Sequence, residues 1–375
     1  MSSVAEALRG LKVGSKEIAE KTSLSLQRVE ELLQGDKAAL SELRAISAGL
    51  RVPMHVLARG QRPSESTSLA PLFRSVRGAG VDLDVTLERV VTFVEAALEL
   101  LPPRAQVPSW LQAFDVGAPS YAEADRIAKQ FRAVVYQYPD DEPAFNLPAI
   151  LGGLEGVIVS RLLYSRYEGV SLVAGNYCFI FISPRFQGRM LFTLGHELGH
   201  ILAHHESGGD AIFEQASQIG TFGERSRKEA FVDAFASCLL LPDVGVGKAL
   251  KAFREHYQVA SRNITDLEIS LLARFYGVSF DVAARRCEDL GLLPRGAGFA
   301  ISDQLKKEFG SPEKRAEHLG LPPRQRVSLA PVSGQLAQSI SRAIRVGNAS
   351  IGWVTDRLGL SIGEVLAINA ESSAP

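Results

Sequence analysis

Residues 191–204 read LFTLGHELGHILAH and specify a helix in the centre of the chain. Apolar residues recur there at spacings of three and four, the pattern of a helix with one buried face: Leu191, Leu194, Leu198 and Ile201. His196 and His200 are four residues apart, so both can project from one side of that helix and bind one metal ion. Glu197 lies one position further round, where a carboxylate can take a proton from a water molecule on the metal. The sequence therefore predicts a metal site on this helix.

The third protein ligand must come from elsewhere in the chain, because catalytic zinc sites combine three protein ligands with a water molecule. Glu229 lies 29 residues after His200 and opens a second helical run, residues 230–241, which Pro242 ends. Asp233 follows on the same face, where it can accept a hydrogen bond from a ligand histidine and fix its orientation. Two such carboxylates usually lie on the solvent-exposed side of a helix and bind nothing. The segment is otherwise apolar, so we predict Glu229 as the third ligand and Asp233 as the partner of a ligand histidine.

Two glycines interrupt the first helix at positions four residues apart, Gly195 and Gly199. Each costs about 1 kcal/mol relative to alanine inside a helix, so we expect both to serve packing. Since they share one face, they would let another helix approach closely. The helix that starts near Glu229 is the candidate.

These residues carry a resemblance. Phe192–His200, followed by Glu229-x-x-x-Asp233-x-Phe235-Ala236, is similar to the ImmA/IrrE family of metallopeptidases. The likeness covers roughly residues 120–292 and includes the strand expected at residues 176–182. It departs from the family in minor ways, with Asp233 where Asn is also common and Val232 where Ala is usual.

The resemblance implies a zincin-like domain with a small sheet that binds Zn²⁺, or in some members responds to Mn²⁺. It also implies a metal-dependent endopeptidase that cuts a transcriptional repressor of the Cro/C1 type. Such cleavage would derepress stress, prophage or mobile-element genes. The implied metal ligands are His196, His200 and Glu229, and Glu197 would be the general base toward metal-activated water.

The sequence leaves open which group stabilises the oxyanion and how the substrate is bound. His204, His205 and Tyr177 are near enough in sequence to stabilise the oxyanion of the reaction, although the two histidines can equally be a polar helix end. The strand at residues 176–182 could lie at a sheet edge and pair with an extended substrate.

Composition points to a folded chain that works inside the cell. The 375 residues are 46% hydrophobic and have a formal net charge of −1. The charge of the whole chain therefore does not favour binding to nucleic acid. The three cysteines, Cys178, Cys238 and Cys287, lie in apolar runs, as expected of reduced core thiols. We see no signal peptide and no apolar run long enough to span a membrane, so we expect a cytoplasmic protein without a membrane partner.

The N-terminal residues resemble a helix-turn-helix domain of the Cro/C1 (XRE-like) type. Residues 15–21 would form its first helix and residues 25–33 its recognition helix, ended by Gly35. Such a helix would enter the major groove of DNA through Ser25, Gln27 and Arg28. Residues 1–60 hold nine Lys/Arg and seven Asp/Glu, a difference of only +2. DNA binding and protein binding therefore both remain open for this domain.

One pattern of helix, tight turn and serine-capped helix occurs three times. Residues 18–26, 272–280 and 354–362 align on it, and each has a serine, Ser25, Ser279 or Ser361, at the start of its second helix. The chain therefore carries related helical modules around the central domain, although this turn is common enough that repeat ancestry does not follow.

We expect an α+β fold that is mainly helical, with a zincin-like metallopeptidase domain flanked by helix-turn-helix-like domains. Its expected parts are a helix-turn-helix domain (1–60), a linker with an amphipathic helix (61–119), the peptidase core (120–260), a helix-turn-helix-like extension (261–293) and a C-terminal helical unit (294–375). Residues 62–68 read as linker by composition, and residues 85–100 as the amphipathic helix.

Three classes of function fit the sequence. The first is the repressor-cleaving peptidase, acting on a separate protein or on its own N-terminal domain. The second is a DNA-binding transcriptional regulator whose metal site is sensory or structural, against which the general base Glu197 counts. The third is an interaction or antitoxin-like module. The sequence leaves open whether the chain forms a homodimer.

Overall fold

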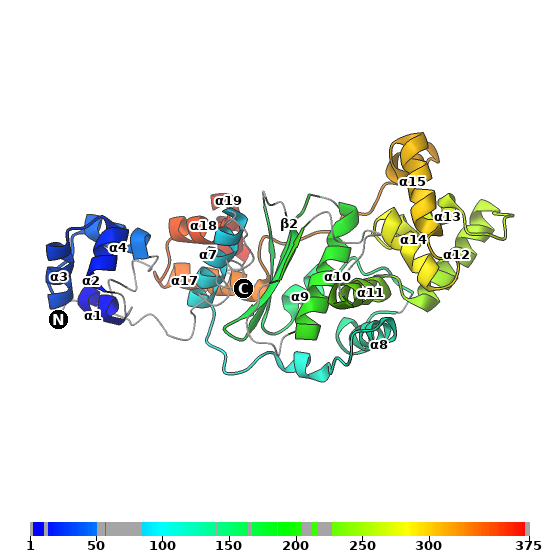
Figure 1. The fold of residues 1–375 in the computed structure, drawn as a ribbon. Coiled ribbons are helices and arrows are strands. Elements are labelled where there is room, and N and C mark those ends of the chain that lie inside the picture. The colour runs from blue at the N-terminus through cyan, green and yellow to red at the C-terminus, as the bar shows by residue number, and fades with distance from the viewer. Residues whose placement is uncertain are drawn as a thin grey trace. The chain divides into compact units, whose positions relative to one another are not determined.

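The computed structural model describes residues 3–10, 14–50, 57, 85–139, 141–163, 165, 167–185, 187–204, 212–215 and 227–371 (Figure 1). The chain divides into two compact units, Met1–Ser68 and Leu69–Pro375. The linker predicted at residues 62–68 lies outside the described residues. The fold is α+β and mainly helical, as predicted.

The first unit contains four described helices: α1 (Ser3–Gly10), α2 (Ser15–Thr22), α3 (Leu26–Gln34) and α4 (Leu40–Leu50). Ser23 ends α2 in the left-handed conformation (φ 56°), and the Ser25 side chain caps α3 by accepting the Arg28 backbone N–H. Helices α2 and α3 thus occupy the two predicted segments. Their small core is formed by Ile18, Val29, Leu32 and Ile46 with their neighbours.

The second unit is built on a four-stranded sheet of order β1-β3-β2-β4. The strands are β1 (Val157–Arg161), β2 (Tyr167–Ala174), β3 (Tyr177–Ile182) and β4 (Ile212–Gln215). A tight turn joins β2 to β3 through Gly175 and Asn176, which both have positive φ (56° and 61°) as hairpin turns require. Strand β3 runs antiparallel to β2 on one side and parallel to β1 on the other.

The expectation that the strand at residues 176–182 forms a sheet edge is therefore wrong. The hairpin turn pairs β3 with β2, and β1 occupies its other side, so no backbone groups of β3 are left for an extended substrate. Beyond β1, Ser160 forms an isolated bridge with Val332, which brings the C-terminal part of the chain to that side of the sheet.

Helices cover both faces of the sheet (Figure 1). Alternate residues of β3 point to opposite faces, as the pleat dictates. Cys178, Ile180 and Ile182 belong to one core, with α8 (Tyr121–Phe131), α9 (Leu147–Gly153), α10 (Gln187–His204) and α11 (Arg227–Leu240). Phe179 and Phe181 belong to the other, with α7 (Val85–Leu100), α17 (Gly334–Arg345), α18 (Ile351–Leu358) and α19 (Ile362–Glu371). The amphipathic helix predicted at residues 85–100 is α7, and its apolar side packs on this sheet.

Four further helices extend the first core: α12 (Asp243–Tyr257), α13 (Asp266–Phe275), α14 (Phe280–Asp289) and α15 (Ala297–Phe309). Helix α16 (Pro312–His318) packs in a small separate cluster with Leu271 and Leu321. A 3-10 helix (Ser109–Ala113) and a π-helical segment (Arg132–Tyr136) flank α8. The segment predicted as one C-terminal unit, residues 294–375, divides between two places. Helices α15 and α16 contact α14 and α13, whereas α17 and α18 contact α7.

The repeated pattern of helix, tight turn and serine-capped helix is present at all three places in the chain. The turn residues Ser23, Gly277 and Gly359 all have positive φ (56°, 70° and 63°). The serine hydroxyl that follows each turn accepts a backbone N–H of the next helix.

Among the described residues, no single helix is long and apolar enough to span a membrane. Helices α11 and α12 together have the length and composition of a membrane span, but they are bent by 53° relative to each other.

Candidate metal centre

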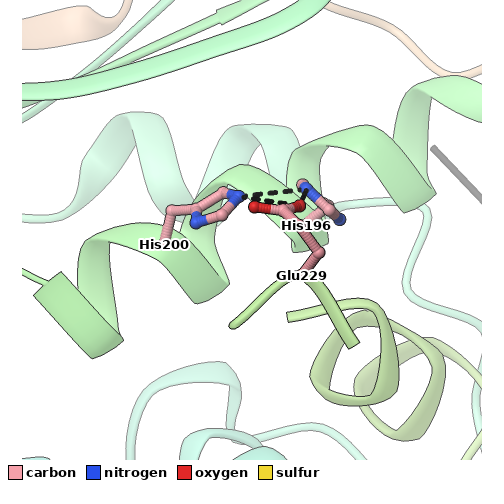
Figure 2. Close-up of side chains that lie close together, drawn as sticks. All are labelled: His196, His200 and Glu229. Atoms are coloured by element: carbon pink, nitrogen blue, oxygen red, sulfur yellow. Dashed lines mark hydrogen bonds and ion pairs between the residues drawn. The ribbon is translucent and has the colours of Figure 1, made fainter. Parts of the chain in front are cut away.

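Helices α10 and α11 bring three side chains together at one point (Figure 2). His196 and His200 project from the same side of α10, and their Nε2 atoms are 3.1 Å apart. Glu229 comes from the first turn of α11. Its Oε2 atom lies 3.5 Å from Nε2 of His196 and 3.7 Å from Nε2 of His200. The structure thus places all three predicted ligands within reach of one ion.

The spacing of these atoms fits a tetrahedral metal ion. Zinc is bound at about 2.0–2.2 Å by histidine nitrogen and carboxylate oxygen. Two ligands of a tetrahedron are then about 3.3–3.6 Å apart, close to the three separations found here. The donor set of two imidazoles and one carboxylate suits Zn²⁺ and does not exclude Mn²⁺.

Close packing of α10 on α11 brings Glu229 to the histidines. A Cβ atom added to Gly195 would lie 3.3 Å from Cβ of Ala236, and one added to Gly199 would lie 3.1 Å from Phe235 and from Val232. Both contacts are at the tight end of van der Waals distances. The predicted role of the two glycines, to admit the helix that carries Glu229, is confirmed.

Asp233 holds the imidazole of His196. Its Oδ1 atom lies 2.9 Å from Nδ1 of His196, and both side chains are buried. When Nδ1 donates this hydrogen bond, Nε2 keeps its lone pair and faces the other two ligands, which is the tautomer that metal binding needs. On its other side, Oδ2 of Asp233 lies 3.7 Å from a guanidinium nitrogen of Arg285 in α14.

Glu197 is fully buried against strand β2. The hydroxyl of Ser171 donates a 2.5 Å hydrogen bond to Oε2 of Glu197. A Cβ atom at Gly169 would lie only 2.3 Å from Oε1 of the same carboxylate, so the carboxylate requires a glycine there. Sequence reasoning identified neither residue. A glycine inside a strand often marks such a close approach, and this was the available signal.

The cysteines are not candidates for the site. All three are unpaired and buried. Burial raises the pKa of Cys178 and Cys287 to about 12 and that of Cys238 to about 11. Since the thiolate is the metal-binding and nucleophilic form, these groups are inert thiols at neutral pH.

One of the three residues considered for the oxyanion is excluded. The Tyr177 hydroxyl donates a 2.8 Å hydrogen bond to the carbonyl of Pro102, and the ring belongs to the core on the α7 side of the sheet. Tyr177 therefore faces away from α10. His205 and the side chain of His204 lie outside what the structure describes.

The residues predicted to read DNA are engaged within the first unit. The Arg28 guanidinium donates to both carboxylate oxygens of Glu42, at 2.7 and 3.2 Å, and to Glu31 at 2.9 Å. These bonds raise the pKa of Arg28 and lower that of Glu42. Gln27 donates to Glu31, and Ser25 caps α3. A DNA role for Ser25, Gln27 and Arg28 stays a prediction, which these contacts do not favour.

The region that contains the metal centre matches a known protein family. Residues 161–288 match the IrrE N-terminal-like domain of the M78 peptidases. The match covers about a third of the chain and includes α10 and α11 with every predicted ligand. It supports the resemblance to the ImmA/IrrE family, a metallopeptidase-type hydrolase and the use of a divalent metal.

The match does not reach the N-terminal unit, so its classification as helix-turn-helix stays a prediction. A comparison with curated proteins found no match.

Proposed function

We propose that this protein is a metal-dependent endopeptidase that cleaves a Cro/C1-type transcriptional repressor, or its own N-terminal unit. Cleavage would derepress stress, prophage or mobile-element genes. Since repressors act on DNA inside the cell, we assign the reaction to the cytoplasm. The N-terminal unit would contribute by recognising the repressor or its DNA.

The observation that carries the proposal is the meeting of His196, His200 and Glu229, with Glu197 next to the first ligand in the sequence. A purely structural metal site has no need of a general base. The peptidase reading is also supported by the family match over these residues.

In this mechanism the chain's own residues hold the ion and move the proton. A bound divalent ion would lower the pKa of a water molecule and polarise the scissile carbonyl. Glu197 takes the proton of the attacking water and passes it to the leaving amine. Ser171 orients the Glu197 carboxylate, and Asp233 keeps His196 in the tautomer that binds metal.

The test is an incubation of wild type and Glu197→Gln with a purified Cro/C1-type repressor, with Zn²⁺ or Mn²⁺, read by intact-mass spectrometry. We expect fragments only with wild type and metal. If neither the repressor nor the chain itself is cut, or if Glu197→Gln cuts as well as wild type, the proposal fails.

The alternative is a DNA-binding regulator whose metal site is sensory or structural. The arrangement of α2 and α3 is the observation in its favour, and the internal pairing of Arg28 counts against it. Metal binding without cleavage in the same incubation would favour this alternative.

A further inference from the structure

A cavity of about 1000 Å³ adjoins the metal centre on the side of Asp233. Its walls come from the start of α8, from α11, and from α14 and α15 of the helical extension. Asp233, which bonds the metal ligand His196, forms part of the wall. So do Ala230, which follows the ligand Glu229, and Phe192, one helical turn before His196. The wall of the cavity therefore comes within one helical turn of two predicted metal ligands, His196 and Glu229.

Three polar groups in the cavity wall make no hydrogen bond to the described residues. Ser237 is buried, with 4% of its surface exposed, and its hydroxyl makes no hydrogen bond. A buried polar group without a partner costs about 1–3 kcal/mol, so such groups are rare unless water or a ligand satisfies them. Arg227 and Arg295 also line the cavity, and within the described part of the chain neither makes a hydrogen bond or a close ion pair.

The acidic residues of the wall make their close contacts with other groups. Asp233 is held by His196 and lies near Arg285. Glu288 accepts a 2.6 Å hydrogen bond from the backbone N–H of Gly298. Burial raises the pKa of Asp289, and the positive charges of Arg286, Arg285 and Arg295 oppose that shift. Neither Arg227 nor Arg295 makes a hydrogen bond or a close ion pair with these carboxylates within the described residues, so both guanidinium groups can meet a carboxylate of a ligand.

Apolar surface lies beside this charge. The Phe299 side chain in α15 is 53% exposed and the Tyr121 side chain in α8 is 41% exposed, and both line the cavity. Exposed aromatic rings next to arginines are typical of protein-binding surfaces. The volume is at the upper end for a ligand site and exceeds what one side chain fills. A short stretch of polypeptide fits both the size and the mixed lining.

We propose that this cavity binds a segment of the protein substrate beside the scissile bond and selects an acidic side chain within it, through Arg227 and Arg295. The inference rests on the proposed peptidase function and adds the chemistry that the substrate must present. Because the two arginines are exposed, their effect on selection is electrostatic and falls with salt.

The test uses a library of synthetic decapeptides of random sequence and the full-length Glu197→Gln protein, immobilised and loaded with Zn²⁺. We expect the retained peptides to be enriched at least threefold in Asp and Glu. Adding Arg295→Glu, or Arg227→Glu, should abolish the enrichment. Arg262→Glu is the matched control, since Arg262 is also exposed but lies outside the cavity, and it should leave the enrichment unchanged. Equal acidic content in all four pools would overturn the proposal.

Incubation of wild type with the same library separates this inference from the proposed function. Cleavage with an acidic preference that Arg295→Glu removes supports both. Cleavage without any acidic preference keeps the peptidase and overturns the role of the cavity. Retention of acidic peptides without cleavage by any metal-loaded form supports a peptide-binding cavity and contradicts the peptidase function.

Discussion

Gly169 of β2 offers a test of the general base that leaves the metal ligands in place. We predict that Gly169→Ala impairs the reaction by displacing Glu197. The new Cβ would lie 2.3 Å from Oε1 of Glu197, 2.7 Å from Cγ2 of Thr193 and 2.8 Å from Cγ of Glu197. Real Cβ contacts are not shorter than 3.0 Å, so the carboxylate oxygen must move by at least 0.7 Å (3.0 minus 2.3). Glu197 is fully buried, which leaves no open space for a harmless adjustment.

The size of the effect follows from this displacement. A misplacement of about 1 Å in a catalytic group can cost about 10²-fold in rate. We therefore expect kcat/KM to fall by about tenfold to hundredfold, and overpacking to cost about 1–3 kcal/mol of stability. Zinc affinity should change less than threefold, because no ligand is touched.

The assay is the initial rate of cleavage of a fluorogenic peptide taken from the library above, with zinc affinity measured by competition with a coloured chelator. Gly247→Ala in α12 is the matched control, since no atom lies within 4 Å of its added Cβ. It should keep the rate and gain up to about 1 kcal/mol in helix stability. A Gly169→Ala protein that folds and has the kcat/KM of wild type would refute the reasoning.

Three further predictions concern single side chains. Ser171→Ala should lower kcat several-fold with KM and zinc affinity unchanged; an unchanged kcat, or a loss of zinc affinity, would contradict its positioning role. Asp233→Ala removes the acceptor that orients a ligand histidine, so zinc affinity by chelator competition should fall about 10- to 100-fold, and an unchanged affinity would exclude this role. A hydrogen bond from Arg126 lowers the pKa of Glu123 to about 2, so its stabilisation is present above pH ~4.5 and is lost as the pH falls toward 2. The urea midpoint of Glu123→Gln should therefore lie below that of wild type at pH 7 and approach it at pH 3, and a pH-independent difference would contradict the pairing.

The metal ligands could be predicted from the sequence because each lies in a short stretch with a recognisable pattern. His196 and His200 share a helix whose period is visible in 14 residues. Glu229 and Asp233 are notable as acidic residues in an otherwise apolar helix, although only the fold shows that the two helices meet. Gly195 and Gly199 could be read in advance because a glycine inside a helix has a known cost.

Contacts between segments that are far apart in the chain could not be predicted from the sequence. Whether the strand at residues 176–182 is central or at an edge depends on where β1 and the residues near 332 return, which no local pattern encodes. Ser171 lies 26 residues before Glu197 and has no distinguishing neighbours. Arg28 has the residue type and position of a DNA contact, and only the folded unit reveals its pairing with Glu42, 14 residues later.

The central claim is that one metal ion, held by His196, His200 and Glu229, serves a reaction that needs Glu197. The most direct measurement is a zinc titration of the metal-free wild type, Glu197→Gln and Glu229→Ala proteins, with bound metal and repressor cleavage read in parallel. We predict that wild type and Glu197→Gln each bind one equivalent, that only wild type cleaves, and that Glu229→Ala loses both tight binding and cleavage. Cleavage by Glu197→Gln, or full zinc binding and activity in Glu229→Ala, would contradict the account.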